Sequence, residues 1–284
     1  MASNENSFVG FGNDSEWKAF EEIHKVFIDK VPLIYKTFSK VFTRKFDASS
    51  PRVNKIIFQL GAMCVEDFKE ILLLCANGYG IGGQKLLRGM YEKAVTAEYL
   101  SLHPDTAEDF WNYYYVHMRK TSNQAKKYFG ETFLSDVETA EIEEEYNRVK
   151  ERFEETACKK CGTKKPQMSW TKNSIEAMIS KDSLLKELYY DCYFLPTLQF
   201  HTTVPSILNR LEPIEEPMGA YFSSNSQKEE VKTTLRNTHL LMLSVLILQN
   251  EHSNLGLTDE LSERGFDFEE TWANKKNTDN ELEK

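Results

Sequence analysis

Apolar side chains recur every three or four residues along most of the chain, as they do on the buried face of an α-helix. The recurrence begins at Ser15, after a polar stretch over residues 1–14 that we expect to be flexible. It predicts a first helix that is kinked or divided at Pro32. We find no internal repeat and no convincing strand, and polar residues return over 273–284, which we also expect to be flexible. The pattern therefore predicts one all-α domain over residues 15–272.

Start and stop signals divide this domain into separate helices. Ser50 followed by Pro51 predicts the beginning of a long apolar helix, which the glycine-rich segment 78–83 then connects to the next helix. His103 and Pro104 end that second helix. Further start signals, each a polar capping residue with glutamate three positions later, are found at Asp105, Ser135, Asn173 and Ser226. The expected architecture is a single helical bundle.

An acidic segment after Ser135 has a narrower apolar seam than the other predicted helices. Its apolar residues are spaced four, three and four apart, at Ile142, Tyr146, Val149 and Phe153. A seam this narrow is typical of a helix that contacts one neighbour only. We therefore expect a helix that reaches about Thr156 and belongs to an acidic arm over about 134–168, inserted in the domain and projecting from the bundle. A CxxC turn at Cys158 and Cys161 interrupts the arm.

Composition narrows the class of protein further. The 284 residues are 40% hydrophobic and 28% charged, which suffices for a core, and 13 glycines and 8 prolines are few for a β-sandwich or barrel. The net charge of −9 argues against a dedicated nucleic-acid coat and still allows a local basic patch. Neither a signal peptide nor an apolar run of about twenty residues is found, so we expect a cytoplasmic protein without a membrane span.

The CxxC pair is the one candidate metal site. Cys158 and Cys161, followed by Gly162, are spaced like half of a zinc knuckle, but a structural zinc ion needs four ligands. Cys192 or His201 would complete the site only if the fold brought them close. The alternative is a turn that carries two reduced thiols and needs no cofactor. This loop is basic because it carries Lys159, Lys160, Lys164 and Lys165. These lysines either contact a phosphate backbone or are simply solvated.

Charged residues interrupt a broadly apolar predicted helix over about residues 84–102. At 100° per residue, the apolar side chains over 84–102 fill an arc of roughly 220°, so most of this helix is expected to be buried. Glu98 falls near the middle of the arc, and Arg88 and Glu92 lie at its edge, four residues apart. A buried carboxylate needs a partner, because an unpaired charge in the core is costly. We therefore expect a polar network around these residues.

Two interpretations of this network stay open. In the first, Arg88 binds phosphate through its planar guanidinium, His201 transfers a proton near neutral pH, and Glu92 orients either of them; Glu98 and His117 are secondary candidates. In the second, Arg88 and Glu92 form a salt bridge that fixes the register of the helix, and the histidines are structural. Sequence motifs of P-loop proteins, zinc metalloproteases and α/β-hydrolases are absent.

The order of several motifs resembles that of an uncharacterised bacterial family of all-helical domains. The shared motifs are an R-x-x-x-E helix (Arg88 to Glu92), a mid-chain Trp170, and a tyrosine-rich segment that ends in S-x-x-x-H at His201. Here Thr197 takes the place of the serine. The resemblance extends over about residues 55–250 and implies an all-helical fold.

Such proteins are loosely compared with the HEPN superfamily of helical bundles, many of which are ribonucleases of toxin–antitoxin and phage-defence systems. The HEPN signature R-x4-6-H is absent, because Arg236 and His239 are only three residues apart. A nuclease would therefore need a composite site of Arg88, Glu92 and His201.

These observations lead to three functional hypotheses. The first is a bacterial phage-defence or toxin-type effector that acts on RNA or a nucleotide through the composite site. The second is a non-enzymatic interaction or regulatory module, in which the acidic arm contacts a partner protein. The third is a sensor whose polar pocket binds an anionic ligand.

Overall fold

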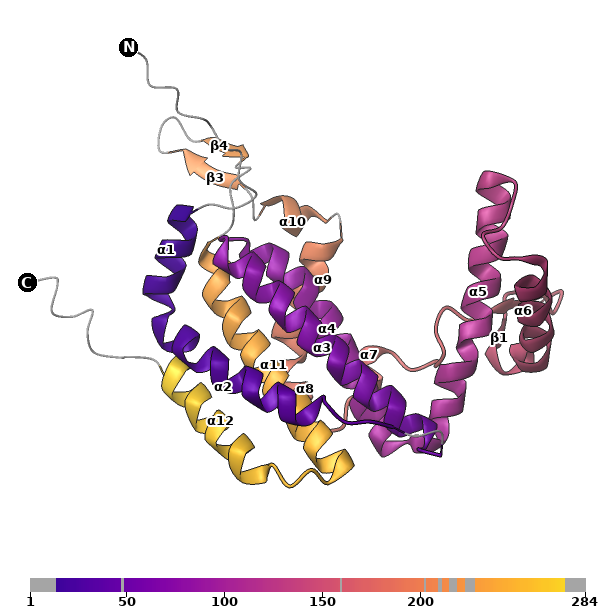
Figure 1. Cartoon of the computed structure of the whole chain (residues 1–284). Helices are drawn as coiled ribbons and strands as arrows, with labels where there is room; N and C mark the ends of the chain where they lie inside the picture. The colour runs from indigo at the N-terminus through magenta and orange to yellow at the C-terminus, as the bar shows by residue number, and fades with distance from the viewer. Residues whose placement is uncertain are drawn as a thin grey trace, which may run out of the picture.

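Helices make up almost all of the regular structure in the computed structural model (Figure 1). It describes residues 14–46, 49–158, 160–201, 203–208, 211–214, 219–222 and 228–273. The expectations for residues 1–13, for Ser226 and for 274–284 lie outside these residues. The all-α prediction is confirmed.

The long helices are α1 (Asp14–Ile23), α2 (Lys25–Val41), α3 (Arg52–Ala76), α4 (Gly80–Leu102), α5 (Ala107–Phe129), α6 (Asp136–Val149), α11 (Glu229–Ser253) and α12 (Thr258–Trp272). The shorter helical elements are η1 (Pro104–Thr106), η2 (Lys150–Phe153), α7 (Ile175–Met178), α8 (Leu184–Tyr189), the π-helical η3 (Tyr190–Phe194), α9 (Leu195–Phe200) and α10 (Val204–Leu208). The described residues also form two antiparallel strand pairs, β1 (Glu154–Thr156) with β2 (Lys164–Pro166) and β3 (Leu211–Ile214) with β4 (Gly219–Phe222). Within the described residues, no helix is long and apolar enough to cross a membrane.

Helix α4 packs against both α3 and α11 at the centre of the bundle (Figure 1). Its broad apolar arc is buried as predicted, including Leu87, Met90, Tyr91 and Val95. The expected glycine connector over 78–83 is shorter than predicted, because α4 already begins at Gly80. At Gly83, a Cβ atom would lie 2.9 Å from Thr234 Cγ2 and 3.2 Å from Cys75 Sγ. Gly83 therefore belongs to the close contact of α4 with α3 and α11.

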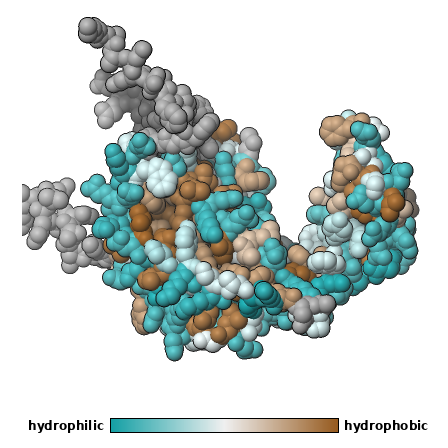
Figure 2. Space-filling view, in the orientation of Figure 1, coloured by the Kyte–Doolittle hydropathy of each residue, from teal (hydrophilic) through white to brown (hydrophobic). Residues whose placement is uncertain are grey.

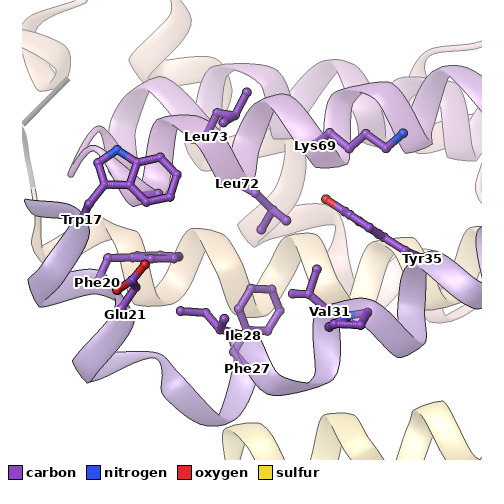
Figure 3. Close-up of a pocket in the computed structure, with 12 residues that line it drawn as sticks. Trp17, Phe20, Glu21, Phe27, Ile28, Val31, Tyr35, Lys69, Leu72 and Leu73 are labelled. Atoms are coloured by element: carbon purple, nitrogen blue, oxygen red, sulfur yellow. The ribbon is translucent and has the colours of Figure 1, made fainter. Parts of the chain in front are cut away.

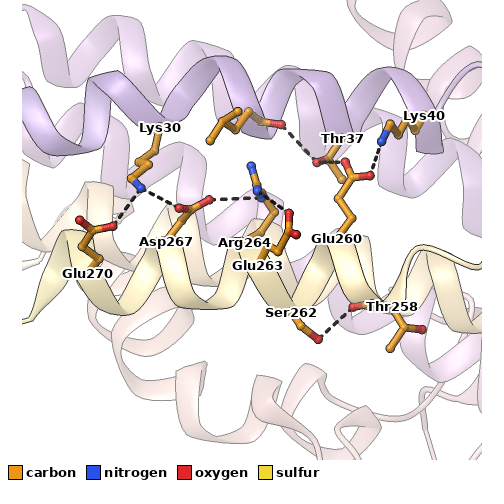
Figure 4. Close-up of polar contacts among 11 residues, drawn as sticks. Lys30, Thr37, Lys40, Thr258, Glu260, Ser262, Glu263, Arg264, Asp267 and Glu270 are labelled. Atoms are coloured by element: carbon orange, nitrogen blue, oxygen red, sulfur yellow. Dashed lines mark hydrogen bonds and ion pairs between the residues drawn. The ribbon is translucent and has the colours of Figure 1, made fainter.

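The first helical segment is divided at His24, whereas Pro32 lies inside α2. His24 leaves the helical region of backbone conformation (φ −107°, ψ 23°), and its ring is buried against Phe20. Polar contacts then join α2 to α12 on the outside of the bundle (Figure 4). Lys30 pairs with Asp267 at 2.8 Å, and Thr37 donates a hydrogen bond to Glu260 at 2.7 Å.

A projecting arm is present, and it is larger than the predicted segment 134–168 because α5 forms one of its two long sides (Figure 1). The capping box of Ser135 and Glu138 starts α6 as expected. Helix α6 ends at Val149 instead of Thr156, and the β1–β2 hairpin follows it, so the expectation of no strand was wrong. The Gln167 N–H donates to the Phe153 carbonyl at 2.7 Å, which extends the hairpin beyond β1 and β2. The Phe153 ring is buried in the core of the arm.

Candidate functional site

Arg88 of α4 is surrounded by side chains of the segment η3–α9. Its guanidinium carbon lies 5.2 Å from the centre of the Tyr193 ring and 5.1 Å from that of Phe200. Its Nε donates to Thr197 Oγ1 at 3.0 Å, and its Nη2 pairs with Glu92 Oε1 at 2.8 Å. Two aromatic faces, a hydroxyl and a carboxylate therefore hold this guanidinium in one orientation.

A π-helical turn places the two rings and the hydroxyl on the side of α4. Pro196 has no N–H, and in a regular α-helix its ring would clash with the carbonyl four residues earlier. The wider turn of η3, just before Leu195 and Pro196, accommodates this ring. Thr197 Oγ1 donates to the Tyr193 carbonyl at 2.6 Å, which fixes its hydroxyl as an acceptor for Arg88. A serine at this position would carry the same hydroxyl.

Among the described residues, the guanidinium keeps N–H donors beyond those that contact Thr197 and Glu92. Arginine has five N–H bonds in a rigid fork, and these two partners use one Nε–H and one Nη2–H. The side chains of Arg88 and Glu92 are 20% and 37% exposed, so the pair lies at the surface of the bundle and not in its core. An incoming anion can reach such an arginine without unfolding the site.

His201 lies beside this cluster but is not hydrogen-bonded to it through its ring. It ends α9, where its backbone N–H donates to the Thr197 carbonyl at 3.2 Å. Its exposed ring packs edge-on against Phe200 with 5.3 Å between ring centres. Among the described contacts, none joins His201 directly to Arg88 or Glu92. The fold thus unites the predicted Arg–Glu pair and places His201 next to it through Phe200.

The secondary candidates Glu98 and His117 lie elsewhere. Glu98 accepts a hydrogen bond from Ser183 Oγ at 2.6 Å, and Ser183 in turn caps α8, so this carboxylate anchors a helix start. His117 lies on α5 in the arm, against the Tyr113 ring. Partial burial and the nearby Lys120 lower the pKa of His117. Neither residue contacts the Arg88 cluster in the part of the chain that is described.

The two CxxC cysteines lie in the loop of the β1–β2 hairpin. Cys161 is exposed, and its sulfur lies 2.8 Å from Thr163 Oγ1. Hydrogen bonds from Thr163 and from Cys158 lower the pKa of Cys161 to about 7. Cys192 is buried in the bundle core, where burial raises its pKa. No cluster of three or more metal-ligating side chains occurs among the described residues, so the fold does not bring Cys192 or His201 to this pair.

Sequence reasoning missed an apolar groove of about 470 Å³ between α1, α2 and α3. Apolar residues gather in this hollow on the face of the bundle (Figure 2). Figure 3 shows Trp17 and Phe20 at one end and Lys69 with Tyr35 at the other. The Lys69 ammonium lies 5.8 Å from the centre of the Tyr35 ring. One sequence feature could have indicated this groove. The first two helices carry more large apolar residues than a single buried face can hold.

Comparison with known proteins identifies the family of this chain. A family model described as "Family of unknown function (DUF5677)" matches residues 54–218, which is more than half of the chain. The chain belongs to the DUF5677 family. The match confirms the expectation of an uncharacterised family. No curated protein and no solved structure matches the chain.

The DUF5677 match contains the whole Arg88 cluster, from α4 through η3 to α9, together with the arm. Helices α1, α2, α11 and α12 lie outside it. Because α11 packs against α3 and α4, this chain completes the core of its DUF5677 region with a helix from beyond the match.

Proposed function

We propose that this DUF5677 protein is a bacterial phage-defence or toxin-type effector that acts on RNA or a nucleotide at Arg88. The observation that carries the proposal is the Arg88 guanidinium, held between the Tyr193 and Phe200 rings with N–H donors to spare. Arginine binds phosphate oxygens through its planar fork, and the exposed Phe200 ring beside it is an aromatic side chain of the kind on which bases stack.

Each neighbour of Arg88 has a role in this proposal. Glu92 and Thr197 hold the guanidinium before the ligand arrives, which lowers the entropic cost of binding. His201, exposed at the end of α9, supplies the general acid or base if the ligand is cleaved. The motif order resembles that of an uncharacterised family that is loosely compared with HEPN defence proteins, and this comparison supports the effector role. An activity would require the composite site, because the R-x4-6-H signature is absent.

Expression in a bacterial host tests the proposal. We compare wild type with Arg88→Ala and His201→Ala, and use Arg148→Ala as the matched control. Arg148 also pairs with a glutamate on its own helix, but it lies on the arm. We expect growth arrest and RNA cleavage with wild type and with Arg148→Ala. Arg88→Ala and His201→Ala should cause neither. The melting temperature of each variant should stay within a few degrees of the wild-type value.

A binding experiment isolates the first step. Fluorescence polarisation with a labelled RNA oligonucleotide should show weaker binding by Arg88→Ala and a smaller slope of log K against log salt, by about one phosphate contact. If Arg148→Ala weakens binding equally, the effect is general electrostatics and the site is not at Arg88. If strains with wild type and with every variant grow like an empty-vector strain, even with a phage trigger, the effector role is wrong.

A second candidate is a non-enzymatic interaction module, which the end of the arm favours. Large apolar side chains are exposed there, at the end of α5 and the beginning of α6, next to acidic side chains of α6: Tyr128, Phe129, Phe133 and Val137. A partner protein with a basic rim around an apolar patch would fit this surface. In that case, Arg88→Ala lowers the stability of the protein and leaves the growth phenotype unchanged. A sensor of an anionic ligand would instead show ligand-dependent stabilisation that disappears in Arg88→Ala.

A further inference from the structure

The hairpin loop between β1 and β2 holds two thiols close together on the outside of the arm. The Gly162 N–H donates to the Cys158 carbonyl at 2.9 Å, and the Ala157 N–H donates to the Thr163 carbonyl at 2.7 Å. Gly162 has φ +69°, a left-handed conformation that favours glycine, and it closes the turn directly after Cys161. The hydrogen bond from Gly162 to Cys158 folds the turn back on itself, so the backbone brings Cys158 and Cys161 close together.

We propose that this hairpin is half of a zinc site, and that the same two cysteines of a second copy of the chain complete it. Zinc in structural sites takes four ligands in a tetrahedron, and thiolates are among its preferred ligands. Cys158 and Cys161 supply two. The described residues offer no third, because no cluster of three or more ligating side chains exists among them. A twofold axis through the metal would supply the remaining two thiolates from an identical loop.

The two carboxylates of the β1–β2 hairpin already form ion pairs. Glu154 pairs with Lys164 at 3.5 Å and Glu155 with Lys165 at 3.1 Å, both across the β1–β2 hairpin. These cross-strand pairs leave the thiols as the ligands of the loop. They also balance the charge of two of its lysines, which would otherwise repel the same loop of another copy.

Position and charge favour a contact between two copies at this point. The hairpin lies on the arm, away from the bundle, so two loops can meet while the bundles stay apart (Figure 1). Cys161 is exposed and accessible to a second chain. Four thiolates around Zn²⁺ carry a net charge of −2, which the exposed Lys160 of each copy would offset.

Zinc content and molecular mass, measured on the full chain with a non-thiol reductant, test the proposal. We load the protein with Zn²⁺, remove free metal, and measure bound zinc by mass spectrometry and mass by light scattering. We expect one zinc ion for every two chains, a dimer with zinc, and a monomer after EDTA. Co²⁺ in place of Zn²⁺ should give the intense near-ultraviolet thiolate bands of a four-sulfur site.

Two variants make the result specific. Cys158→Ser with Cys161→Ser should abolish both zinc binding and dimerisation, whereas Cys192→Ala removes a thiol from the core and should leave both unchanged. One zinc per monomer, a dimer that persists in EDTA or in the double variant, or no retained zinc would each overturn the proposal. Zinc content does not depend on Arg88, so this result is independent of the proposed effector function.

Discussion

At the scale of single residues, His239 shows how burial sets chemistry. Its ring lies in the core, where Trp272 Nε1–H donates to Nδ1 at 3.1 Å, and no described group hydrogen-bonds to Nε2. Burial lowers the pKa of His239 to about 4, although the Asp267 carboxylate nearby works in the opposite direction. The ring is therefore neutral in the folded protein at every pH near neutrality.

His239 should make the protein less stable in mild acid. The unfolded chain takes up a proton near pH 6.5, while the folded ring stays neutral until about pH 4. Stability is therefore fully present above pH 6.5 and is lost as the pH falls from there to 4, by up to about 3 kcal/mol. Urea unfolding at pH 7.5 and 5 checks this against His239→Asn, which keeps an acceptor for Trp272. The variant should lose less stability between the two pH values, and equal losses would contradict the prediction.

The surroundings of Arg88 also predict how much this residue contributes to stability. Because Arg88 and Glu92 are 20% and 37% exposed, their ion pair is solvated and contributes little. We expect Arg88→Ala to cost about 1–2 kcal/mol of unfolding free energy, mostly from lost packing on Tyr193 and Phe200. Chemical denaturation measures this cost. A loss of about 3–5 kcal/mol would be typical of a buried pair and would support the structural interpretation instead.

At the scale of elements, helix existence could be predicted better than helix ends. The predicted extent of α3 is close to the observed one, because a Ser-Pro start and a glycine stop bracket a long apolar run. The beginning of α4 was missed, because glycine in a sequence normally indicates a turn. Here the contact of Gly83 with α3 and α11 leaves no room for a side chain, and such a contact leaves no mark on the local pattern.

Gly83 and Gly89, both in α4, test this reasoning as a matched pair. A Cβ at Gly83 would lie 2.9 Å from Thr234 Cγ2, so Gly83→Ala should destabilise the protein by about 1–3 kcal/mol through overpacking. At Gly89 a Cβ would meet only Lys93 Nζ, at 3.7 Å, so Gly89→Ala should be neutral or stabilise by up to about 1 kcal/mol. Thermal unfolding of both variants gives the comparison. Similar shifts in both would show that α3, α4 and α11 are less closely packed than described.

The candidate site could be predicted only in part, because contacts between elements that are distant in the sequence leave no local pattern. The Arg88–Glu92 pair was visible because both residues lie on one helix at a spacing of four. The stacking of Arg88 on Tyr193 and Phe200 was not, since it joins elements about a hundred residues apart in the sequence. The β1–β2 hairpin was equally hidden, because strands of three residues are too short to show an alternating pattern.

At the scale of the whole molecule, Trp170 connects the arm to the bundle. The described core consists of three clusters, two in the bundle and one in the arm, and Trp170 packs against all three. Its ring lies edge-on to Phe110 of α5 at 5.3 Å and to Tyr99 of α4 at 6.0 Å. The arm cluster, built on Tyr113 and Phe153, is small. It therefore depends on this connection more than the bundle does.

Trp170→Ala should uncouple the arm from the bundle. We expect a loss of about 3 kcal/mol and, in hydrogen exchange, faster exchange across α5, α6 and the β1–β2 hairpin, while α3, α4 and α11 stay protected. Tyr128→Ala is the control, because Tyr128 also lies on α5 in the arm but its side chain is 70% exposed. This variant should change the exchange rates little. If Trp170→Ala instead raises exchange evenly over all helices, the arm and bundle unfold as one unit, and Trp170 belongs to a single core.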